Sequence, residues 1–210
     1  MDGNTQEDDE ILDSCKIVLV GESGTGKTCI IDRYIYDRFK PNQQSTASNY
    51  VCKIISLKND KKIRLDIWDT AGQEKFRSLN KFFYKDATIA IMVYDITQKS
   101  SFESIKEYWH NEIKSQVGDK IIFGLAGNKS DLYKTETVSE NEARSYAQEI
   151  GAVFELTSSI ENTGIDELFT KLVEKYYGCN HGDIDTGTKH KGGVQLNKKM
   201  NKNVKGKKCC

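Results

Sequence analysis

The stretch GESGTGKT, residues 21–28, is the most informative part of this chain for its fold. It follows the short apolar run CKIVLV (15–20), which is typical of a strand buried in a parallel sheet. After it, apolar side chains recur at helical spacing from residue 30 to residue 35. The glycine-rich stretch therefore stands between a buried strand and a helix. Its G-x-x-x-x-G-K-[ST] pattern requires this context in order to indicate a phosphate-binding loop.

The residue types of this loop suit the phosphate chain of a nucleotide. Three glycines let the backbone curl, so that successive N–H groups and the helix N-terminus point at phosphate oxygens; they are Gly21, Gly24 and Gly26. Lys27 supplies a positive charge to the β- and γ-phosphates, and the Thr28 hydroxyl is a ligand for Mg²⁺. A chance glycine-rich turn is the alternative. The position of the stretch favours binding of a nucleoside triphosphate or diphosphate.

Apolar runs alternate with helical patterns from Cys15 to about Tyr177. They predict further strands at 50–57, 63–68, 88–94 and 120–127, and helices at 102–115, 139–150 and 165–177. The first two of these strands flank NDKK (59–62), which indicates a hairpin. Ser139 followed by Glu142 is typical of a capping box. The pattern as a whole predicts a three-layer α/β fold with a mostly parallel sheet and one antiparallel pair.

The charges are unevenly distributed along the 210 residues. Lys plus Arg and Asp plus Glu each number 31, but residues 186–210 carry eight lysines and no acid, so residues 1–185 have a net charge of −8. The acidic body argues against general binding of nucleic acid. We expect a disordered acidic extension at 1–14, one folded domain at 15–177 and a disordered basic tail at 178–210.

The sequence also indicates where in the cell the protein is expected. The chain has no apolar run of 18 residues, and its acidic start is unlike a secretory signal or a transit peptide. We therefore expect the protein in the cytosol or on a cytosolic face.

The strand expected at 63–68 runs directly into DTAGQE (69–74). Asp69, at the carboxyl end of a strand beside the phosphate loop, is placed to reach Mg²⁺ through water. Gly72 lets its N–H approach the γ-phosphate because no side chain stands in the way. Gln73 can orient an attacking water molecule, so it is the predicted catalytic residue.

The tetrapeptide NKSD (128–131) follows the strand expected at 120–127. The Asp131 carboxylate can accept hydrogen bonds from N1–H and N2–H₂ of guanine, whereas adenine offers no such pair of donors. Taken singly, NKSD is also a common surface tetrapeptide. Its spacing from the phosphate loop and from DTAGQ favours the guanine interpretation.

These motifs together resemble one family. GESGTGKT, WDTAGQEKF (68–76), VYDIT (93–97), GNKSD (127–131) and the final Cys-Cys are similar to the Rab branch of the Ras superfamily of small GTPases. The resemblance implies the P-loop GTPase fold, with a six-stranded sheet and about five helices. It also implies a monomeric GTP/GDP switch with Mg²⁺ that regulates vesicle-mediated membrane traffic. The implied partners are an exchange factor, a GTPase-activating protein, a GDP-dissociation inhibitor, the prenylation machinery and effectors.

The resemblance assigns further site residues position by position. Phe39 falls where the family has an aromatic ring against guanine, and Thr46 where a threonine completes the Mg²⁺ shell in the GTP state. Ser159 falls where a backbone N–H reads the guanine O6. The remaining positions belong to the phosphate loop or to the base motifs; they are Ser23, Thr25, Asn128, Lys129 and Ser158.

The sequence departs from the family after Thr46. The run Ala47-Ser48-Asn49-Tyr50-Val51 lacks the usual Ile-Gly, and Val51 stands where an aromatic normally joins Trp68 and Phe83 in a partner-facing triad. We expect an effector surface formed by Val51, Trp68 and Phe83, with Trp68 as a plain core residue being the alternative. Ile160 replaces a lysine beside the base, which predicts weaker packing against guanine and no change of base.

The chain ends KGKKCC (205–210). A disulfide between adjacent cysteines would be strained, a metal site lacks further ligands, and an unmodified tail is the remaining alternative. A C-a-a-X box is absent, so the simplest prenylation rule does not apply. The resemblance implies geranylgeranyl groups on Cys209 and Cys210, which would hold the protein on intracellular membranes while a GDP-bound pool is cytosolic. Two lipid chains and a lysine-rich arm suffice for stable attachment.

The favoured interpretation is a slow GTP hydrolase stimulated by an activator, because no arginine of the switch segments is clearly placed to act in cis. The alternative is a nucleotide-locked adaptor, a binding module for which turnover is irrelevant. The sequence does not separate the two.

Overall fold

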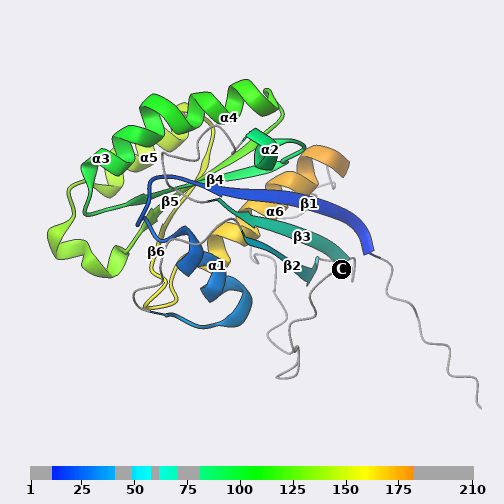
Figure 1. The fold of residues 1–210 in the computed structure, drawn as a ribbon, viewed down its shortest axis with the longest axis horizontal. Coiled ribbons are helices and arrows are strands. Elements are labelled where there is room, and N and C mark those ends of the chain that lie inside the picture. Colours follow the sequence, from blue (N-terminus) through cyan, green and yellow to red (C-terminus); the bar gives the residue numbers. More distant parts are fainter. Residues whose placement is uncertain (1–10, 41–48, 58–61, 71–80, 182–210) are drawn as a thin grey trace, which may run out of the picture.

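The computed structural model describes residues 11–40, 49–57, 62–70 and 81–181 (Figure 1). Within them lies one six-stranded sheet of order β2-β3-β1-β4-β5-β6. Only β2 and β3 pair antiparallel among these strands, and every other neighbouring pair is parallel. The strands are β1 (Ile11–Val20), β2 (Asn49–Ser56), β3 (Lys62–Asp69), β4 (Ile89–Asp95), β5 (Ile122–Asn128) and β6 (Val153–Thr157). The predicted fold class is confirmed.

The helices connect these strands as the alternating pattern predicts. They are α1 (Lys27–Tyr36), α2 (Lys81–Tyr84), α3 (Lys99–Ser104), η2 (Ile105–Trp109), α4 (His110–Val117), the 3₁₀ helix η3 (Ser130–Thr135), α5 (Glu140–Glu149) and α6 (Ile165–His181). Segments α3, η2 and α4 follow one another without a break, so residues 99–117 form one continuous helix. Its middle turn is a π-helix, which the sequence pattern did not predict. The predicted cap of α5 is present, since the Ser139 hydroxyl accepts a hydrogen bond from the Glu142 N–H.

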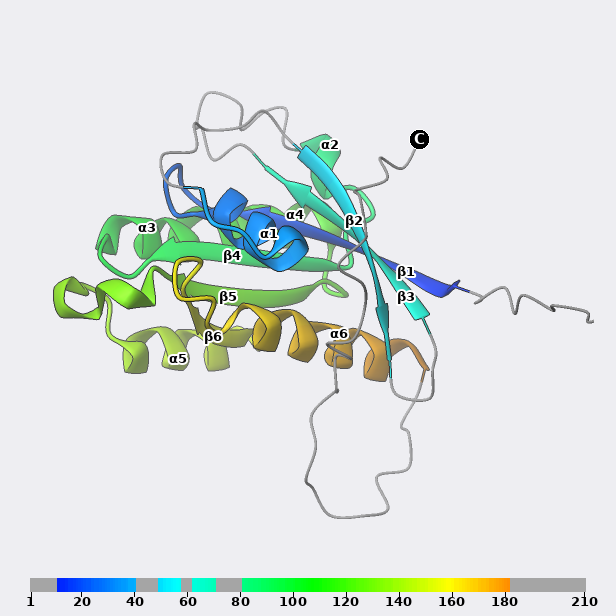
Figure 2. The same cartoon turned by 90° about the horizontal axis from the view of Figure 1, so that it is seen from below.

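Helices cover both faces of the sheet and make two separate cores. Strands β4 and β5 are buried along their whole length, as expected for the middle of a parallel sheet. One core lies between the sheet and α1 with α6, and the other between the sheet and α2, α3, α4 and α5. Figures 1 and 2 show this three-layer arrangement from two directions, with α6 running along the face opposite α3 and α4.

The folded unit extends beyond the predicted limits of 15–177 at both ends. Strand β1 begins at Ile11 and pairs with β3, and α6 continues to His181. The Tyr176 hydroxyl donates to Asp13 at 2.9 Å, which joins the two ends of the domain. Short-range periodicity did not predict residues 11–14 as a strand because ILDS is half polar and its pairing partner lies on β3. The predicted hairpin turn around Asn59 falls outside the described residues.

The topology brings five chain segments to one edge of the sheet. Parallel strands end on the same side, so the residues that follow β1, β3, β4, β5 and β6 meet there. None of the described helices has the length and apolar character needed to span a bilayer.

Candidate nucleotide site

The glycine-rich loop links the end of β1 to the start of α1 and lies against two neighbouring strands. Gly21 has φ +139°, and a Cβ atom there would come within 2.1 Å of the Val93 carbonyl oxygen. Gly26 has φ +95°, and its Cβ would come within 2.2 Å of the Asn128 side-chain nitrogen. Only glycine fits either place, so the loop packs directly on β4 and on the residue that ends β5.

Other residues of the loop differ in exposure. Ser23 and Gly24 are exposed, whereas Thr25 is buried and its hydroxyl donates to the Glu22 carbonyl at 3.0 Å. Helix α1 begins at Lys27, directly after the loop, so its first N–H groups face the same space. This strand–loop–helix geometry is the one that binds phosphate groups in P-loop proteins.

Lys27 lies folded back into the loop. Its ammonium donates to the carbonyls of Gly21 at 2.9 Å and Glu22 at 2.8 Å. Burial lowers the pKa of Lys27 to about 8, against smaller opposing effects of Asp69 and Glu22. A partly desolvated ammonium inside a loop of N–H donors is suited to an anionic ligand, which would restore the charge interactions that the lysine loses on burial.

Thr28 and Asp69 meet beside this loop although they are 41 residues apart in the chain. The Thr28 hydroxyl donates to the Asp69 carboxylate at 2.6 Å, and Asp69 is buried at the end of β3. The next residue, Thr70, donates its hydroxyl to the Leu19 carbonyl and so ties the end of β3 to β1. A hydroxyl and a carboxylate in contact supply hard oxygen donors, which fits the preference of Mg²⁺.

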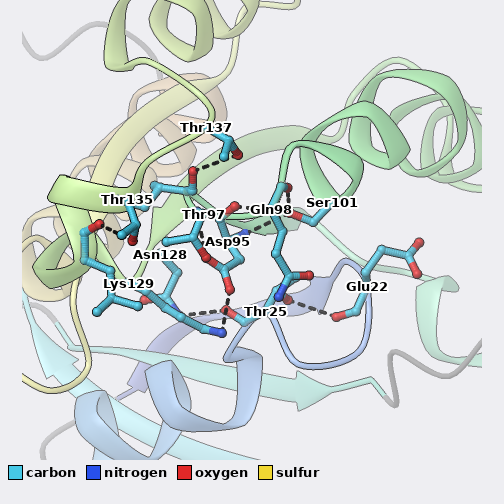
Figure 3. Close-up of polar contacts among 12 residues, drawn as sticks. Glu22, Thr25, Asp95, Thr97, Gln98, Ser101, Asn128, Lys129, Thr135 and Thr137 are labelled. Carbon is cyan, nitrogen blue, oxygen red and sulfur yellow. Dashed lines mark hydrogen bonds and ion pairs between the residues drawn. The ribbon is translucent and has the colours of Figure 1, made fainter.

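Asn128 connects three of the converging segments, and Figure 3 shows its contact with Thr25 of the phosphate loop. Its side-chain nitrogen donates to the Thr25 carbonyl at 2.7 Å, and its side-chain oxygen accepts from the Thr157 hydroxyl at 3.1 Å. All three residues are at most 2% exposed. The first residue of NKSD therefore fixes the phosphate loop and the end of β6 relative to each other.

Lys129 is held by the aspartate of VYDIT. Its ammonium lies 2.6 Å from an oxygen of Asp95, which is buried at the end of β4, and the other oxygen accepts from the N–H and hydroxyl of Thr97 (Figure 3). The Lys129 backbone has φ +65°, a left-handed conformation that is unusual for a lysine. Asp95 thus positions a predicted base-binding residue, a role that the sequence reasoning did not assign to it.

Asp131 and the loop after β6 form the far end of the site. The Ser158 hydroxyl donates to the Asp131 carboxylate at 2.6 Å and accepts from the Glu161 N–H at 3.1 Å. Ser159 is buried, and its carbonyl accepts from the Arg33 side chain at 2.8 Å, so α1 holds this loop. The predicted residues Asn128, Lys129, Asp131, Ser158 and Ser159 therefore meet at one edge of the sheet. Phe39 lies half-buried three residues after α1.

Comparison with known proteins agrees with this geometry. A model of the Ras family matches residues 16–178. The Ras-related protein Rab-21 of Homo sapiens is 35% identical over 206 residues, which cover 94% of this chain and 91% of that protein. The chain belongs to the Rab family of small GTPases.

Two further relatives come from other organisms. Rab-21 of Geodia cydonium is 39% identical over 166 residues, covering 79% of this chain and 72% of that protein. The putative ras-related protein Rab-5B of Dictyostelium discoideum is 42% identical over 166 residues, covering 77% of this chain and 76% of that protein. As a Rab GTPase the chain binds GTP and takes part in vesicle traffic, and GTP hydrolysis, Mg²⁺ and membrane association are general properties of its family.

The aromatic surface of this Rab GTPase differs from the one predicted. Tyr50 lies opposite Trp68 in the β2–β3 register, with 5.0 Å between their ring centroids. The Phe83 ring centroid lies 5.9 Å from that of Trp68. Val51 was assigned to this surface wrongly, because successive strand residues point to opposite faces and Val51 packs against the core beneath α1 and α6. Tyr50, which is 40% exposed, completes the aromatic cluster. The sequence alone could place Tyr50 opposite Trp68 only if the register of the β2–β3 hairpin were known, and that register depends on the length of the turn.

Five predicted residues of this Rab GTPase fall outside the described residues. They are Thr46, Gly72, Gln73, Cys209 and Cys210. Ile160, which follows Ser159 in the loop after β6, is 56% exposed.

Proposed function

We propose that GTP and GDP bind along the edge of the sheet where β1, β3, β5 and β6 end. The observation that carries this proposal is the Asn128 side chain, which joins the phosphate loop at Thr25 to the end of β6 at Thr157. Two motifs of separate chemistry therefore belong to one continuous site. The phosphate chain lies over the loop residues and the guanine over NKSD and the loop after β6; the loop residues are Gly21, Ser23, Gly24, Thr25, Gly26, Lys27 and Thr28.

Asp131 is the residue that selects guanine in this proposal. Its carboxylate is oriented by the Ser158 hydroxyl, and a carboxylate can accept from the two donors that guanine presents side by side. An adenine nucleotide lacks these two donors, so it would lose the hydrogen bonds that the Asp131 carboxylate makes to guanine. Lys129 lies along the base, the backbone N–H of Ser159 faces the guanine O6, and Phe39 packs at the edge of the ring.

Thr28 would hold Mg²⁺ directly, with Thr46 in the GTP state and with Asp69 through water. The adjacent oxygens of Thr28 and Asp69 support this assignment. When bound, Mg²⁺ neutralises charge on the β- and γ-phosphates.

GTP hydrolysis by this chain is slow on its own and stimulated by an activating protein. Gln73 orients the attacking water, and Gly72 and Thr46 respond to the γ-phosphate. Among the described residues around the site, Arg33 is bonded to the carbonyls of Ser159 and Ile160 on the base side, so it is not available to the γ-phosphate. An arginine supplied by a partner raises turnover in a related GTPase by about 10⁵-fold.

GTP-dependent changes at Thr46 and Gly72 would control effector binding at the cluster of Tyr50, Trp68 and Phe83. A GDP-dissociation inhibitor would extract the GDP form from the membrane. Geranylgeranyl groups on Cys209 and Cys210, together with the lysine-rich tail, would return the protein to the cytosolic face of an intracellular membrane. Replacing both cysteines by serine should make the protein wholly soluble in cells while GDP affinity is unchanged.

The nucleotide assignment is tested by calorimetry with Mg²⁺ and GDP, GTP or ATP. Wild-type protein should bind GDP and GTP tightly and ATP not measurably. Asp131→Asn should lose affinity for GDP and gain affinity for xanthosine diphosphate, because the acceptor becomes a donor that faces a carbonyl of xanthine. Asp119→Asn is the matched control, since Asp119 is exposed and pairs only with the surface residue Lys114 in the contacts described. Equal affinity for ATP and GTP would refute the guanine assignment.

Hydrolysis is tested separately by single-turnover measurement with and without an activating protein. Gln73→Leu should bind GDP normally and hydrolyse GTP more slowly than wild type. Turnover that neither Gln73→Leu nor any activator changes would favour the alternative, a binding module for which hydrolysis is irrelevant.

A further inference from the structure

The carboxylate of Glu22, in the phosphate loop, reaches out of the loop to the long helix at residues 99–117. It accepts a hydrogen bond from the Ser104 hydroxyl at 2.5 Å and one from the Trp109 indole nitrogen at 3.1 Å. Trp109 is 1% exposed and belongs to the core beneath α3, α4 and α5, so its N–H direction is set by packing. Glu22 is only partly exposed. Two donors on a rigid helix therefore hold one acceptor in the second position of the loop.

The π turn at Ile105–Trp109 makes this double contact possible. Ser104 and Trp109 are five residues apart, and in an α-helix such residues lie about 140° apart around the axis. A π turn is closed by hydrogen bonds between residues five apart, and here the His110 N–H donates to the Ile105 carbonyl. The extra residue in the turn brings Ser104 and Trp109 to the same side of the helix. Single π turns within α-helices occur frequently at functional sites.

The contacts of the Glu22 carboxylate with Ser104 and Trp109 form a clamp, and the main chain of Glu22 connects this clamp to the phosphate site. Its carbonyl accepts from the Lys27 ammonium at 2.8 Å and from the Thr25 hydroxyl at 3.0 Å. The same residue thus binds the helix through its side chain and the phosphate-binding lysine through its backbone. Movement of the Glu22 side chain would move the carbonyl that Lys27 contacts.

We propose that Glu22 is a positioning residue for nucleotide binding: Ser104 and Trp109 hold its carboxylate, and its carbonyl thereby holds the Lys27 ammonium in place. This inference rests on the proposed nucleotide site. The clamp adds a route by which the π turn, 82 to 87 residues away in sequence, influences how long a nucleotide stays bound.

The test measures the rate of GDP dissociation from the full chain with a fluorescent GDP analogue. Glu22→Ala should accelerate dissociation about tenfold, the change expected when hydrogen bonds to a charged group are lost. Glu22→Gln keeps an acceptor oxygen without the charge and should stay within about threefold of wild type. Glu107→Ala, which removes an exposed carboxylate from the same π turn, is the matched control and should not change the rate.

Coupling between the residues separates positioning from a general loss of packing. Trp109→Phe keeps an aromatic ring and removes the N–H, so it should accelerate GDP dissociation alone but have no further effect in the Glu22→Ala background. Effects that multiply in the double variant would overturn the proposal, as would unchanged rates in both single variants. If Glu22→Ala does not fold, Ser104→Ala combined with Trp109→Phe tests the same clamp from the helix side.

A spectroscopic readout supports the kinetic test. The chain has two tryptophans, so an ¹⁵N-labelled sample gives two indole N–H signals, with Trp68 as the internal reference. The Trp109 signal should shift in Glu22→Ala and remain unchanged in Glu107→Ala. A Trp109 indole N–H chemical shift that is the same in Glu22→Ala as in wild type would overturn the proposed contact. Failure of wild-type protein to bind GDP at all would instead refute the nucleotide site itself.

Discussion

Replacing Asn128 by alanine removes the side chain that joins the phosphate loop, the end of β5 and the end of β6. In the native protein its nitrogen donates to the Thr25 carbonyl at 2.7 Å and its oxygen accepts from the Thr157 hydroxyl at 3.1 Å. Thr25 and Thr157 are no more than 1% exposed, so water does not readily replace the lost partner at either group. We expect Asn128→Ala to destabilise the domain and to weaken GDP binding together.

The magnitude follows from the two groups left behind. A buried polar group deprived of its partner costs about 1–3 kcal/mol, and two such groups give a total of about 3 kcal/mol when partial relaxation is allowed. For a domain of this size, each kcal/mol shifts the midpoint of thermal unfolding by about 2–4 °C. Asn128→Ala should therefore lower the midpoint by about 6–12 °C.

The assay is thermal unfolding of the full chain in saturating GDP, followed by circular dichroism. Bound nucleotide adds its own stabilisation, which depends on its concentration, so each variant is measured at several GDP concentrations. The spacing of the midpoints then separates lost affinity from lost intrinsic stability. Asn111→Ala, an exposed position on α4, is the control and should change stability by no more than about 0.5 kcal/mol. If the unfolding midpoints of Asn128→Ala match those of Asn111→Ala, the contacts of Asn128 with Thr25 and Thr157 do not stabilise the fold.

Three further predictions follow from other contacts of the domain. Gly21→Ala should prevent folding or nucleotide binding, because its Cβ would lie 2.1 Å from the Val93 carbonyl oxygen; normal expression and GDP affinity would contradict this. Lys27 has a pKa of about 8 in the free protein and binds phosphate as the ammonium, so GDP affinity should fall about tenfold between pH 7 and pH 9. Calorimetry in two buffers should then show proton uptake on binding. An affinity independent of pH would show that this ammonium is not required. Val51→Ala should destabilise the domain by about 1 kcal/mol and leave Trp68 fluorescence unchanged. Tyr50→Ala should change Trp68 fluorescence with little effect on stability. The reverse pattern would contradict the observed register of β2.

Lys27 also affects stability in the absence of nucleotide. Its pKa is lower in the folded protein than in the unfolded chain, so the unfolded chain binds more protons between pH 8 and about pH 10.5. The contribution of this group therefore favours unfolding below pH 8 and diminishes as the pH rises through that window. Bound phosphate opposes this cost, because it stabilises the ammonium form.

The positions that were predicted correctly lie in short segments whose neighbours along the chain determine their conformation. Gly21 and Gly26 need positive φ, Ser139 caps the helix that follows it, and strands β4 and β5 are continuous apolar runs. Each of these features depends on residues within a few positions, so periodicity and residue type are sufficient to predict it.

The π turn and the start of β1 were not predicted for the opposite reason. The sequence of residues 105–109 is compatible with an ordinary α-helix, and the turn is a π-helix only in the context of what it packs against. Residues 11–14 become a strand because β3 and the Tyr176 hydroxyl provide partners for them. Such partners are distant in the sequence and leave no periodic signal.

The sequence by itself determined that this chain has a P-loop fold, the order of its nucleotide motifs and its place in the Rab family. Only the tertiary structure decided which side chains meet across the site. Asn128 reaches Thr25 over 103 residues, Glu22 reaches Trp109 over 87, and Tyr50 instead of Val51 joins Trp68. Motifs are local and are carried by backbone conformation and residue type, whereas these contacts depend on strand register and helix phase, which the packing of distant segments sets.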